Sequence, residues 1–287
     1  ACLVRNLPVF GMDHLLEVVK LLNGEEGRKP ASYSLSELIG EVKSEVDFSE
    51  VKGQQQAKRG LEVAAAGGHN ILLIGPPGSG KTMLARRLPT ILPDMVFEEI
   101  IEVTQIYSAA GLLGNRAAIS QRPFRSPHHT ITDTGLVGGG NFPRPGEVSL
   151  AHRGVLFMDE FPEFGRQALE SLRQPLEDGH VTISRVASSL TFPCSFMLIA
   201  AMNPCSDVFI GSGLGVHCTD IERRKYYSRL SRPLLDRIDI QIEVPAVKYQ
   251  DIVGRPPGES STEIKKRVSA ARKIQWERFR GRRIFAN

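Results

Sequence analysis

The chain has 287 residues, enough for one large α/β domain with an appendage or for two small domains. Hydrophobic residues make up 41% and charged residues 24%, the balance of an ordinary globular protein, and no apolar run approaches the length of a membrane span. This composition excludes a membrane-spanning protein. Four widely spaced cysteines without a CxxC pair do not predict a disulfide framework, so we expect a cytoplasmic protein with no membrane partner.

The positive charge is unevenly distributed, although the formal net charge is only +4. The segment from Thr262 to Asn287 contains nine Lys or Arg residues and only two Glu residues. A second basic run spans Glu222 to Arg232. Two interpretations stay open from charge alone. These runs are either solvated helix faces or surfaces for sequence-independent contact with nucleic acid.

The first 32 residues differ in pattern from the main part of the chain. Apolar residues at helical spacing between residues 12 and 24 predict a short amphipathic helix that ends near Gly24, and a polar connector comes next. The first residue is not Met. We therefore expect residues 1–32 to be the tail of an upstream domain plus a linker, with the main domain beginning near residue 33.

Short apolar runs alternate with helical patterns through the main domain, which predicts an α/β fold with a five-stranded parallel sheet. The expected strands are Asn70–Gly75, Ile100–Val103, Val155–Asp159, Phe196–Met202 and Ile238–Val244. Two segments interrupt the alternation. Ser120–Arg153, rich in Gly, Pro and His, is expected to be an insertion with hairpin elements, and residues 180–193 predict a second hairpin.

The strongest motif lies between the first expected strand and a helical pattern. It fits G-x-x-x-x-G-K-[ST] in full and consists of Gly75, Pro76, Pro77, Gly78, Ser79, Gly80, Lys81 and Thr82. Glycines let backbone N–H groups surround phosphate oxygens, Lys81 would reach the β- and γ-phosphates, and the Thr82 hydroxyl would ligate Mg²⁺. Because the flanking pattern agrees, a chance glycine turn is a poor alternative, and the motif predicts ATP and Mg²⁺ as cofactors.

Polar side chains also end two later strands. Asp159 and Glu160 end the run beginning at Val155, where Asp159 would hold Mg²⁺ and Glu160 would polarise the attacking water. The alternative for this pair is a helix N-cap. Asn203 comes directly after the strand ending at Met202 and would bind the γ-phosphate or that water, although Asn-Pro also favours a turn.

Several long strings together resemble the magnesium-chelatase-like family of bacterial AAA+ ATPases, and in particular the branch that contains the competence protein ComM and the YifB proteins. The strings are SPHHTITDTGLVGGGNFPRPGEVSLAHRGVLFMDEFPEF, LESLRQPLEDGHVTISR, AAMNPC and RPLLDRIDIQIEVP. The resemblance runs from about residue 10 to the end. It implies the AAA+ P-loop fold with a helix-2 insertion and a hairpin before the first sensor strand, which suits the two interruptions.

The resemblance also implies site roles and an assembly. Asn203 corresponds to sensor 1, and Arg237 to the arginine finger that one subunit of a hexameric ring offers to its neighbour's ATP. From the residues alone, Arg237 stands between Asp236 and Asp239, so a local ion pair is the alternative. The implied domains are the tail of a Lon-like domain (1–32), the AAA+ core (33–258) and the start of an incomplete helical lid (259–287), with the second sensor arginine beyond Asn287.

Cys205, His217 and Cys218 are candidates for a small metal site. Three ligands are one short of a closed tetrahedral zinc site unless Asp207 joins them, so we favour no metal there. His128 and His129 have no third partner at ligand spacing, and they are expected to serve a polar loop or nucleic acid.

Three functions are compatible with these features. The first is an ATP-driven DNA motor, which the resemblance links to branch migration during recombination of incoming DNA; the two insertions would then face the central pore of the ring, where their cations would contact phosphates. The second is a chelatase-like ATPase that remodels a protein partner without contacting DNA. The third, a nucleotide-gated binding module with negligible turnover, is disfavoured because Lys81, Asp159, Glu160, Asn203 and Arg237 are all present.

Overall fold

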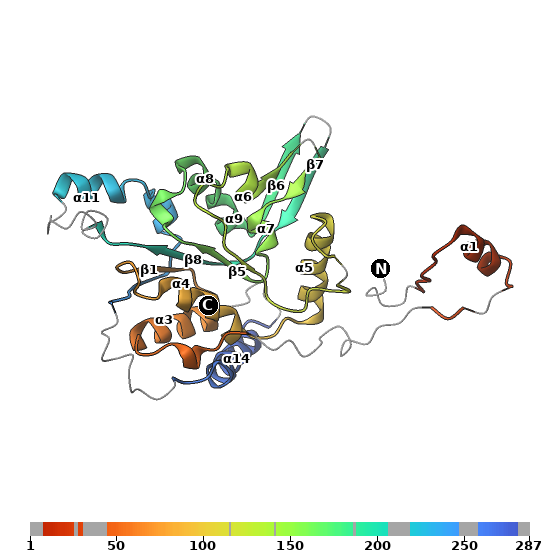
Figure 1. The fold of residues 1–287 in the computed structure, drawn as a ribbon, viewed down its shortest axis with the longest axis horizontal. Coiled ribbons are helices and arrows are strands. Elements are labelled where there is room, and N and C mark those ends of the chain that lie inside the picture. The colour runs from red at the N-terminus through yellow and green to blue at the C-terminus, as the bar shows by residue number, and fades with distance from the viewer. Residues whose placement is uncertain are drawn as a thin grey trace.

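The computed structural model describes residues 8–25, 28–30, 45–114, 116–140, 142–185, 188–205, 219–246 and 258–280. Its centre is a five-stranded sheet in the order β2-β5-β8-β1-β9, in which every pairing is parallel (Figure 1). The strands are β1 (Ile71–Ile74), β2 (Phe124–Arg125), β5 (Val155–Met158), β8 (Met197–Met202) and β9 (Ile240–Glu243). The α/β fold and the five-stranded parallel sheet are therefore confirmed.

The three central strands are buried on both faces, because alternate side chains enter two different cores. Ile71, Leu73 and Phe157 belong to the core beneath helices α3 (Gln55–Gly67) and α4 (Lys81–Ile91). Leu72 and Leu156 belong to the opposite core, which also contains apolar side chains of the helices on that face. Two-sided burial explains why these strands are continuous apolar runs rather than alternating ones.

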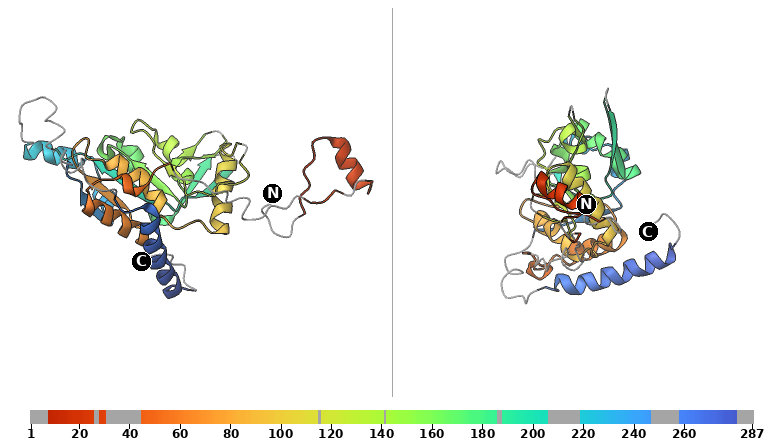
Figure 2. Two further views of the ribbon diagram at one scale, coloured as in Figure 1. Left: turned by 60° about the horizontal axis from the view of Figure 1, so that its bottom comes forward. Right: turned by 90° about the vertical axis from the view of Figure 1, so that its right-hand side faces the viewer.

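Helices cover the two faces in separate groups. Helix α14 (Ser261–Arg278) lies against α3 and α4, and Ile264 and Val268 carry it into their core (Figure 2). The other face carries 3₁₀ helix η2 (Phe161–Glu163) and helices α6 (Asp133–Val137), α7 (Glu147–Leu150), α8 (Arg166–Ser171), α9 (Arg173–Asp178), α11 (Asp220–Tyr227) and α12 (Arg232–Leu235). None of the helices in the described ranges is long and apolar enough to cross a membrane.

The expected strand Ile100–Val103 is wrong, because these residues lie inside helix α5 (Phe97–Ala109). Buried residues in α5 recur at helical spacing, and two glutamates stand in its first turn, where they favour a helix N-terminus. The fifth strand is instead the two-residue β2, at the edge of the sheet. β2 is too short for a periodic pattern to reveal it.

Both expected interruptions contain hairpins. Within Ser120–Arg153, β3 (Gly138–Gly139) pairs antiparallel with β4 (Arg144–Pro145), although the same segment also supplies β2 and the short helices α6 and α7. The second hairpin, β6 (His180–Arg185) and β7 (Ser188–Pro193), directly precedes β8 and projects from the body of the molecule (Figure 1). Near the start of the chain, α1 (Leu15–Leu22) is the expected amphipathic helix, and Gly24 lies just beyond it with a φ of +72°. The domain boundaries at 32 and 258 stay predictions.

A polar clamp fastens the start of the core to the start of α14. Asp47 caps the 3₁₀ helix η1 (Phe48–Glu50), and its carboxylate also accepts hydrogen bonds from the Ser261 backbone N–H at 3.1 and 3.2 Å. The Ser261 hydroxyl accepts in turn from the backbone N–H of Phe48. Burial acts to raise the pKa of Asp47, but the hydrogen bonds from Ser49 and Ser261 outweigh it and hold the pKa below its ordinary value.

We expect Asp47→Ala to lower the free energy of unfolding by about 1 kcal/mol at neutral pH, a typical value for a lost cap. A carboxyl whose folded-state pKa is depressed stabilises the fold above its unfolded pKa, and this contribution is lost as pH falls through the folded pKa. Urea unfolding should therefore show the difference from the parent shrinking as pH falls below the ordinary Asp pKa of about 3.9. Asp220→Ala, at an exposed first-turn position of α11, is the control; an equal loss there would contradict the clamp.

Candidate nucleotide-binding site

The phosphate-loop motif forms the tight turn between β1 and α4. Gly78 and Gly80 have φ values of +74° and +92°, which side chains rarely allow, and α4 begins at Lys81. Gly75 is required for a different reason: a Cβ atom there would lie 2.1 Å from the Val244 carbonyl oxygen, just beyond β9. The Ser79 hydroxyl is buried, and the described residues offer it no hydrogen-bond partner. The shape of the turn therefore depends on glycine at these three positions.

Lys81 lies almost fully buried among oxygen atoms at this turn. Its ammonium donates to the carbonyl oxygens of Gly75 at 2.6 Å and Pro76 at 2.9 Å, and to the Asn203 side-chain oxygen at 3.0 Å. A buried cation beside a loop of backbone N–H groups suits a polyphosphate.

Thr82 and Asp159 meet across two elements. The Thr82 hydroxyl, in the first turn of α4, donates to the Asp159 carboxylate at 2.7 Å, directly after β5. The other Asp159 oxygen accepts from the backbone N–H of Glu160 at 2.9 Å. A hydroxyl and a carboxylate side by side fit Mg²⁺, which binds one or two protein oxygens together with phosphate oxygens and water. These two residues would hold the ion.

Glu160 has an unusual backbone and an exposed side chain. Its φ and ψ of 51° and 45° lie in the left-handed region, an infrequent conformation for a non-glycine residue that is concentrated at functional sites. Its carboxylate lies 3.2 Å from Nδ1 of His129. The residue is the N-cap of η2 but has no side-chain capping bond, so its carboxylate is not committed to the helix.

Asn203 is held on both sides. Its side chain accepts from Lys81, and its backbone oxygen accepts from the Tyr226 hydroxyl at 2.9 Å. Burial raises the pKa of Tyr226 to about 12, so its phenol stays a neutral donor near neutral pH. The parallel register places Ile74, Met158 and Met202 at neighbouring strand ends, which is why the residues after them converge.

Arg237 is absent from this cluster. It lies just beyond α12, where its half-exposed guanidinium forms an ion pair with Glu177 of α9. Asp239, one of the two expected local partners, instead accepts from the Asn70 backbone N–H. The local ion pair with Asp236 or Asp239 is therefore wrong for the described part of the chain, and the outward position leaves Arg237 accessible to a second subunit.

Most cations of the Ser120–Arg153 insertion serve the fold itself. Arg125 makes a bidentate pair with Glu147 at 2.6 and 2.7 Å, and Arg122 donates to the carbonyls of Pro93 and Arg153. Two further residues of the insertion are also engaged within the fold: Arg153 forms an ion pair with Glu102, and His152 is buried. Contact of these cations with phosphates in a central pore stays a prediction. Arg144, in contrast, is exposed on β4.

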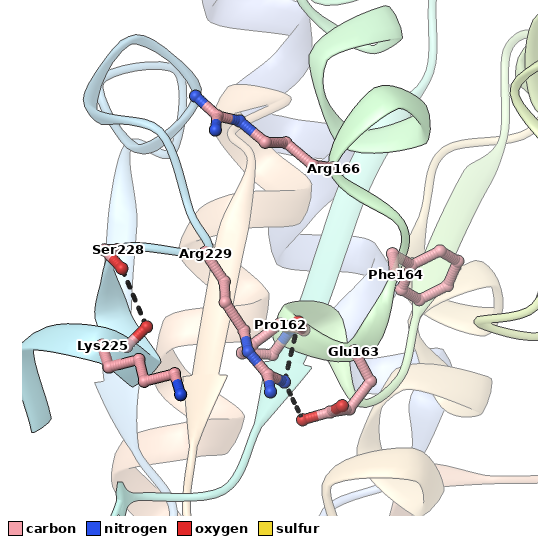
Figure 3. Close-up of a pocket in the computed structure, with 7 residues that line it drawn as sticks. All are labelled: Pro162, Glu163, Phe164, Arg166, Lys225, Ser228 and Arg229. Carbon is pink, nitrogen blue, oxygen red and sulfur yellow. Dashed lines mark hydrogen bonds and ion pairs between the residues drawn. The ribbon is translucent and has the colours of Figure 1, made fainter. Parts of the chain in front are cut away.

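A pocket of about 490 Å³ opens beside η2 (Figure 3). Its charged lining residues are Glu163, Arg166, Lys225 and Arg229, and Arg229 donates to Glu163. Three cations against one anion suit an acidic group. Since its lining begins two residues after Glu160, a ligand in this pocket would lie near the acidic pair.

The cysteines give a mixed result. Cys194 is a buried free thiol, and burial raises its pKa to about 12. Cys205 is disulfide-bonded, a bond that the sequence spacing did not predict. His217, Cys218 and Asp207 lie outside the described residues. No group of three His, Cys, Asp or Glu residues suited to a metal occurs in the part of the chain that the structure describes.

Three residues with long-range contacts at the site are not marked by any sequence motif. Asn70 bonds to the starts of β8 and β9, accepting from Leu198 N–H and donating to the Arg237 carbonyl. Gln54, at a φ of +54°, donates to the carbonyls of Ser79 and Pro245 and so braces the phosphate loop. His129 stands out in the sequence only as half of a histidine pair. No local pattern reveals these residues, because each acts across segments distant in sequence.

A family model described as "Magnesium chelatase, subunit ChlI" matches residues 47–252. The chain is 46% identical over 275 residues to the uncharacterized protein YifB of Escherichia coli (strain K12), covering 93% of the chain and 52% of YifB. It is 44% identical over 283 residues to the competence protein ComM of Haemophilus influenzae, covering 97% and 55% respectively. The chain thus spans about half the length of these relatives.

Among solved structures, the chain is similar to one that describes the complex between subunits BchI and BchD of magnesium chelatase. The TM-score is 0.52 at 21% identity, and the match covers 81% of this chain and 70% of the other. This likeness shows the fold. The family match and the two curated relatives show that the chain belongs to the magnesium-chelatase-like family, among the relatives of YifB and ComM.

Proposed function

We propose that this protein hydrolyses ATP with Mg²⁺ in a ring of identical subunits. The observation that carries the proposal is the convergence of Lys81, Thr82, Asp159 and Asn203, which are joined by hydrogen bonds of 2.7 and 3.0 Å although they come from three adjacent strand ends. Open parallel sheets bind ligands at this edge, and family membership makes a nucleotide the expected ligand.

Each residue then has a defined task. Backbone N–H groups of residues 75–80 and the Lys81 ammonium bind the β- and γ-phosphates, while Thr82 and Asp159 hold the metal. Mg²⁺, when bound, neutralises charge that develops on the phosphate oxygens. Glu160 accepts a proton from the attacking water, and Asn203 orients that water or the γ-phosphate. Because the Glu160 carboxylate is more than half exposed, it can accept this proton without first losing a buried partner.

Ring assembly is supported by the placement of Arg237, which lies outside its own subunit's cluster and pairs there with Glu177. We propose that it leaves Glu177 to contact the γ-phosphate of a neighbouring subunit, where a developing negative charge is the stronger partner. Six subunits are the ring size that the family resemblance implies. A cytoplasmic location stays part of this proposal.

We further propose DNA as the substrate, bound without sequence preference. The family resemblance links the branch that contains the competence protein ComM to incoming DNA, and Arg144 and Arg185 belong to the two hairpins that interrupt the core pattern. The competing proposal is a protein partner, favoured by the structural likeness to a complex between two chelatase subunits. The two proposals differ in whether affinity for DNA exists and falls with salt.

Substituting the proposed base should separate binding from turnover. We expect Glu160→Gln to bind ATP and Mg²⁺ like the parent but to lose turnover by at least about 100-fold, within the range attributed to general base catalysis. Lys81→Ala should weaken nucleotide binding itself. Nucleotide titration and phosphate release measure the two effects, and parental turnover in Glu160→Gln would remove Glu160 from the mechanism.

An arginine finger acting between subunits predicts complementation. Arg237→Ala alone should bind nucleotide and lose turnover by roughly 10³-fold. Lys81→Ala subunits should bind nucleotide only weakly but still carry Arg237, so mixing the two variants should restore turnover well above that of either alone. A mixture no more active than its separate components would contradict a finger in trans.

The DNA proposal is tested by a salt titration of duplex and single-stranded DNA binding at saturating nucleotide. The double variant Arg144→Ala, Arg185→Ala should bind all sequences more weakly and reduce the salt slope by about one unit per lost phosphate contact. Arg59→Ala removes an exposed cation from α3, on the opposite helical layer, and should leave the slope unchanged. A parent protein that binds no DNA would favour the protein partner instead.

A further inference from the structure

The pocket beside η2 has walls of its own, apart from the nucleotide-binding cluster. One wall is η2 together with the first residue of α8, and the other is the C-terminal end of α11 with the turn that follows it. Its charged lining residues are Glu163, Arg166, Lys225 and Arg229 (Figure 3). None of these four has a task in the proposed hydrolysis, so ATP turnover does not explain why they gather around a cavity of about 490 Å³.

The positive charge of this pocket lies at two separate places. Arg166, Lys225 and Arg229 are exposed, and together with one carboxylate they leave an excess of two positive charges. Lys225 and Arg229 are four residues apart at the end of α11, a spacing that places side chains on the same face of a helix. The Arg166 guanidinium, at the start of α8, lies well apart from that of Arg229 (Figure 3). A ligand that balances this charge therefore carries two negative groups at a distance from each other.

The carboxylate in the pocket can give way to such a ligand. Arg229 reaches from the end of α11 to η2, where it donates to the Glu163 carboxylate at 2.5 Å (Figure 3). The two side chains are 47% and 44% exposed, and ion pairs this exposed contribute little to stability. A phosphate group also offers a guanidinium two oxygen atoms at once. A chain with a second phosphate for Arg166 gains a contact that Glu163 cannot match, so it can replace Glu163 as the partner of Arg229.

We propose that this pocket binds two phosphate groups of one phosphate-bearing chain, either a nucleic-acid strand or an inorganic polyphosphate. Lys225 and Arg229 bind one phosphate, and Arg166 binds the other. Every unit of such a chain carries a phosphate on its backbone, whereas an acidic peptide must order a separate flexible side chain for each carboxylate. Binding here requires no hydrolysis of ATP, and it rests on the proposed DNA function only where the chain is DNA.

Substitutions at the two ends of the pocket test this assignment. The probes are inorganic phosphate, tripolyphosphate and a single-stranded oligonucleotide, titrated by calorimetry while ADP and Mg²⁺ saturate the phosphate loop. Arg229→Gln should weaken the binding of a chain about 10-fold, the lower end of the effect of hydrogen bonds to charged groups. Arg166→Gln should weaken the chain similarly but leave the affinity for inorganic phosphate unchanged, because a single phosphate held by Lys225 and Arg229 does not reach the other end.

Glu163→Gln should act in the opposite direction and raise the affinity for the chain, since it removes the competing carboxylate; a variant that merely misfolds cannot give this result. The matched control is Arg223→Gln, which removes an exposed cation of α11 outside the pocket and should bind like the parent. Equal losses in Arg223→Gln and Arg229→Gln, or weaker binding in Glu163→Gln, would overturn the proposal. So would tighter binding of polyglutamate than of either chain, which would assign the pocket to an acidic protein.

The two chains distinguish the source of the phosphates. Losses for the oligonucleotide in Arg166→Gln and Arg229→Gln would identify a nucleic-acid strand, and losses for tripolyphosphate alone would identify an inorganic polyphosphate. A parent protein that binds tripolyphosphate in the pocket but no oligonucleotide would contradict the proposed DNA function and leave the phosphate site standing. A parent that binds the oligonucleotide with the same affinity as both variants, and no tripolyphosphate, would do the reverse.

Discussion

The burial of β1, β5 and β8 on both faces is the constraint on which the rest of the structure depends. Strands packed between two helical layers can expose polar groups only at their ends, and parallel pairing brings all carboxyl ends to one edge. Lys81, Asp159 and Asn203 each stand at or just beyond that edge, in elements fixed by apolar cores on both sides. The site is therefore precise because the strands beneath it cannot slip: a shift of one residue would exchange their two buried faces.

Some positively charged side chains of this protein stabilise the fold and others lie on the surface, and composition does not show which are which. Arg122, Arg125 and Arg153 look like a basic insertion in the sequence, yet each binds a carboxylate or carbonyl of its own subunit. A half-buried guanidinium needs such partners, since its desolvation is otherwise unfavourable. Exposed cations, in contrast, can meet an external anion without breaking the core. Counts of Lys and Arg therefore overstate the surface offered to nucleic acid.

Sequence reasoning succeeded where one local rule decides the outcome. A turn rich in glycine between an apolar strand and a helix admits few structures, so β1, the phosphate loop and α4 could be predicted, as could the strands that lead to Asp159 and Asn203. It failed at Ile100–Val103, where a short apolar run fits a strand and a buried helix equally well. The strand β2 and the roles of Asn70 and His129 could not be predicted. Each depends on contacts with segments that are far away in the chain.

The hydrogen bonds of Lys81 suggest how the site responds to charge. In the structure its ammonium donates to two carbonyl oxygens and to the Asn203 amide, all of them neutral acceptors. A phosphate oxygen carries negative charge, so the ammonium gains a direct Coulombic attraction to it that the neutral acceptors do not offer. If a phosphate binds as proposed, the ammonium would turn toward it at the expense of its weakest neutral partner. Asn203, at 3.0 Å the most distant of the three, would then lose Lys81 as a donor while Tyr226 keeps its backbone fixed, and its side-chain oxygen would become free to accept from a water molecule.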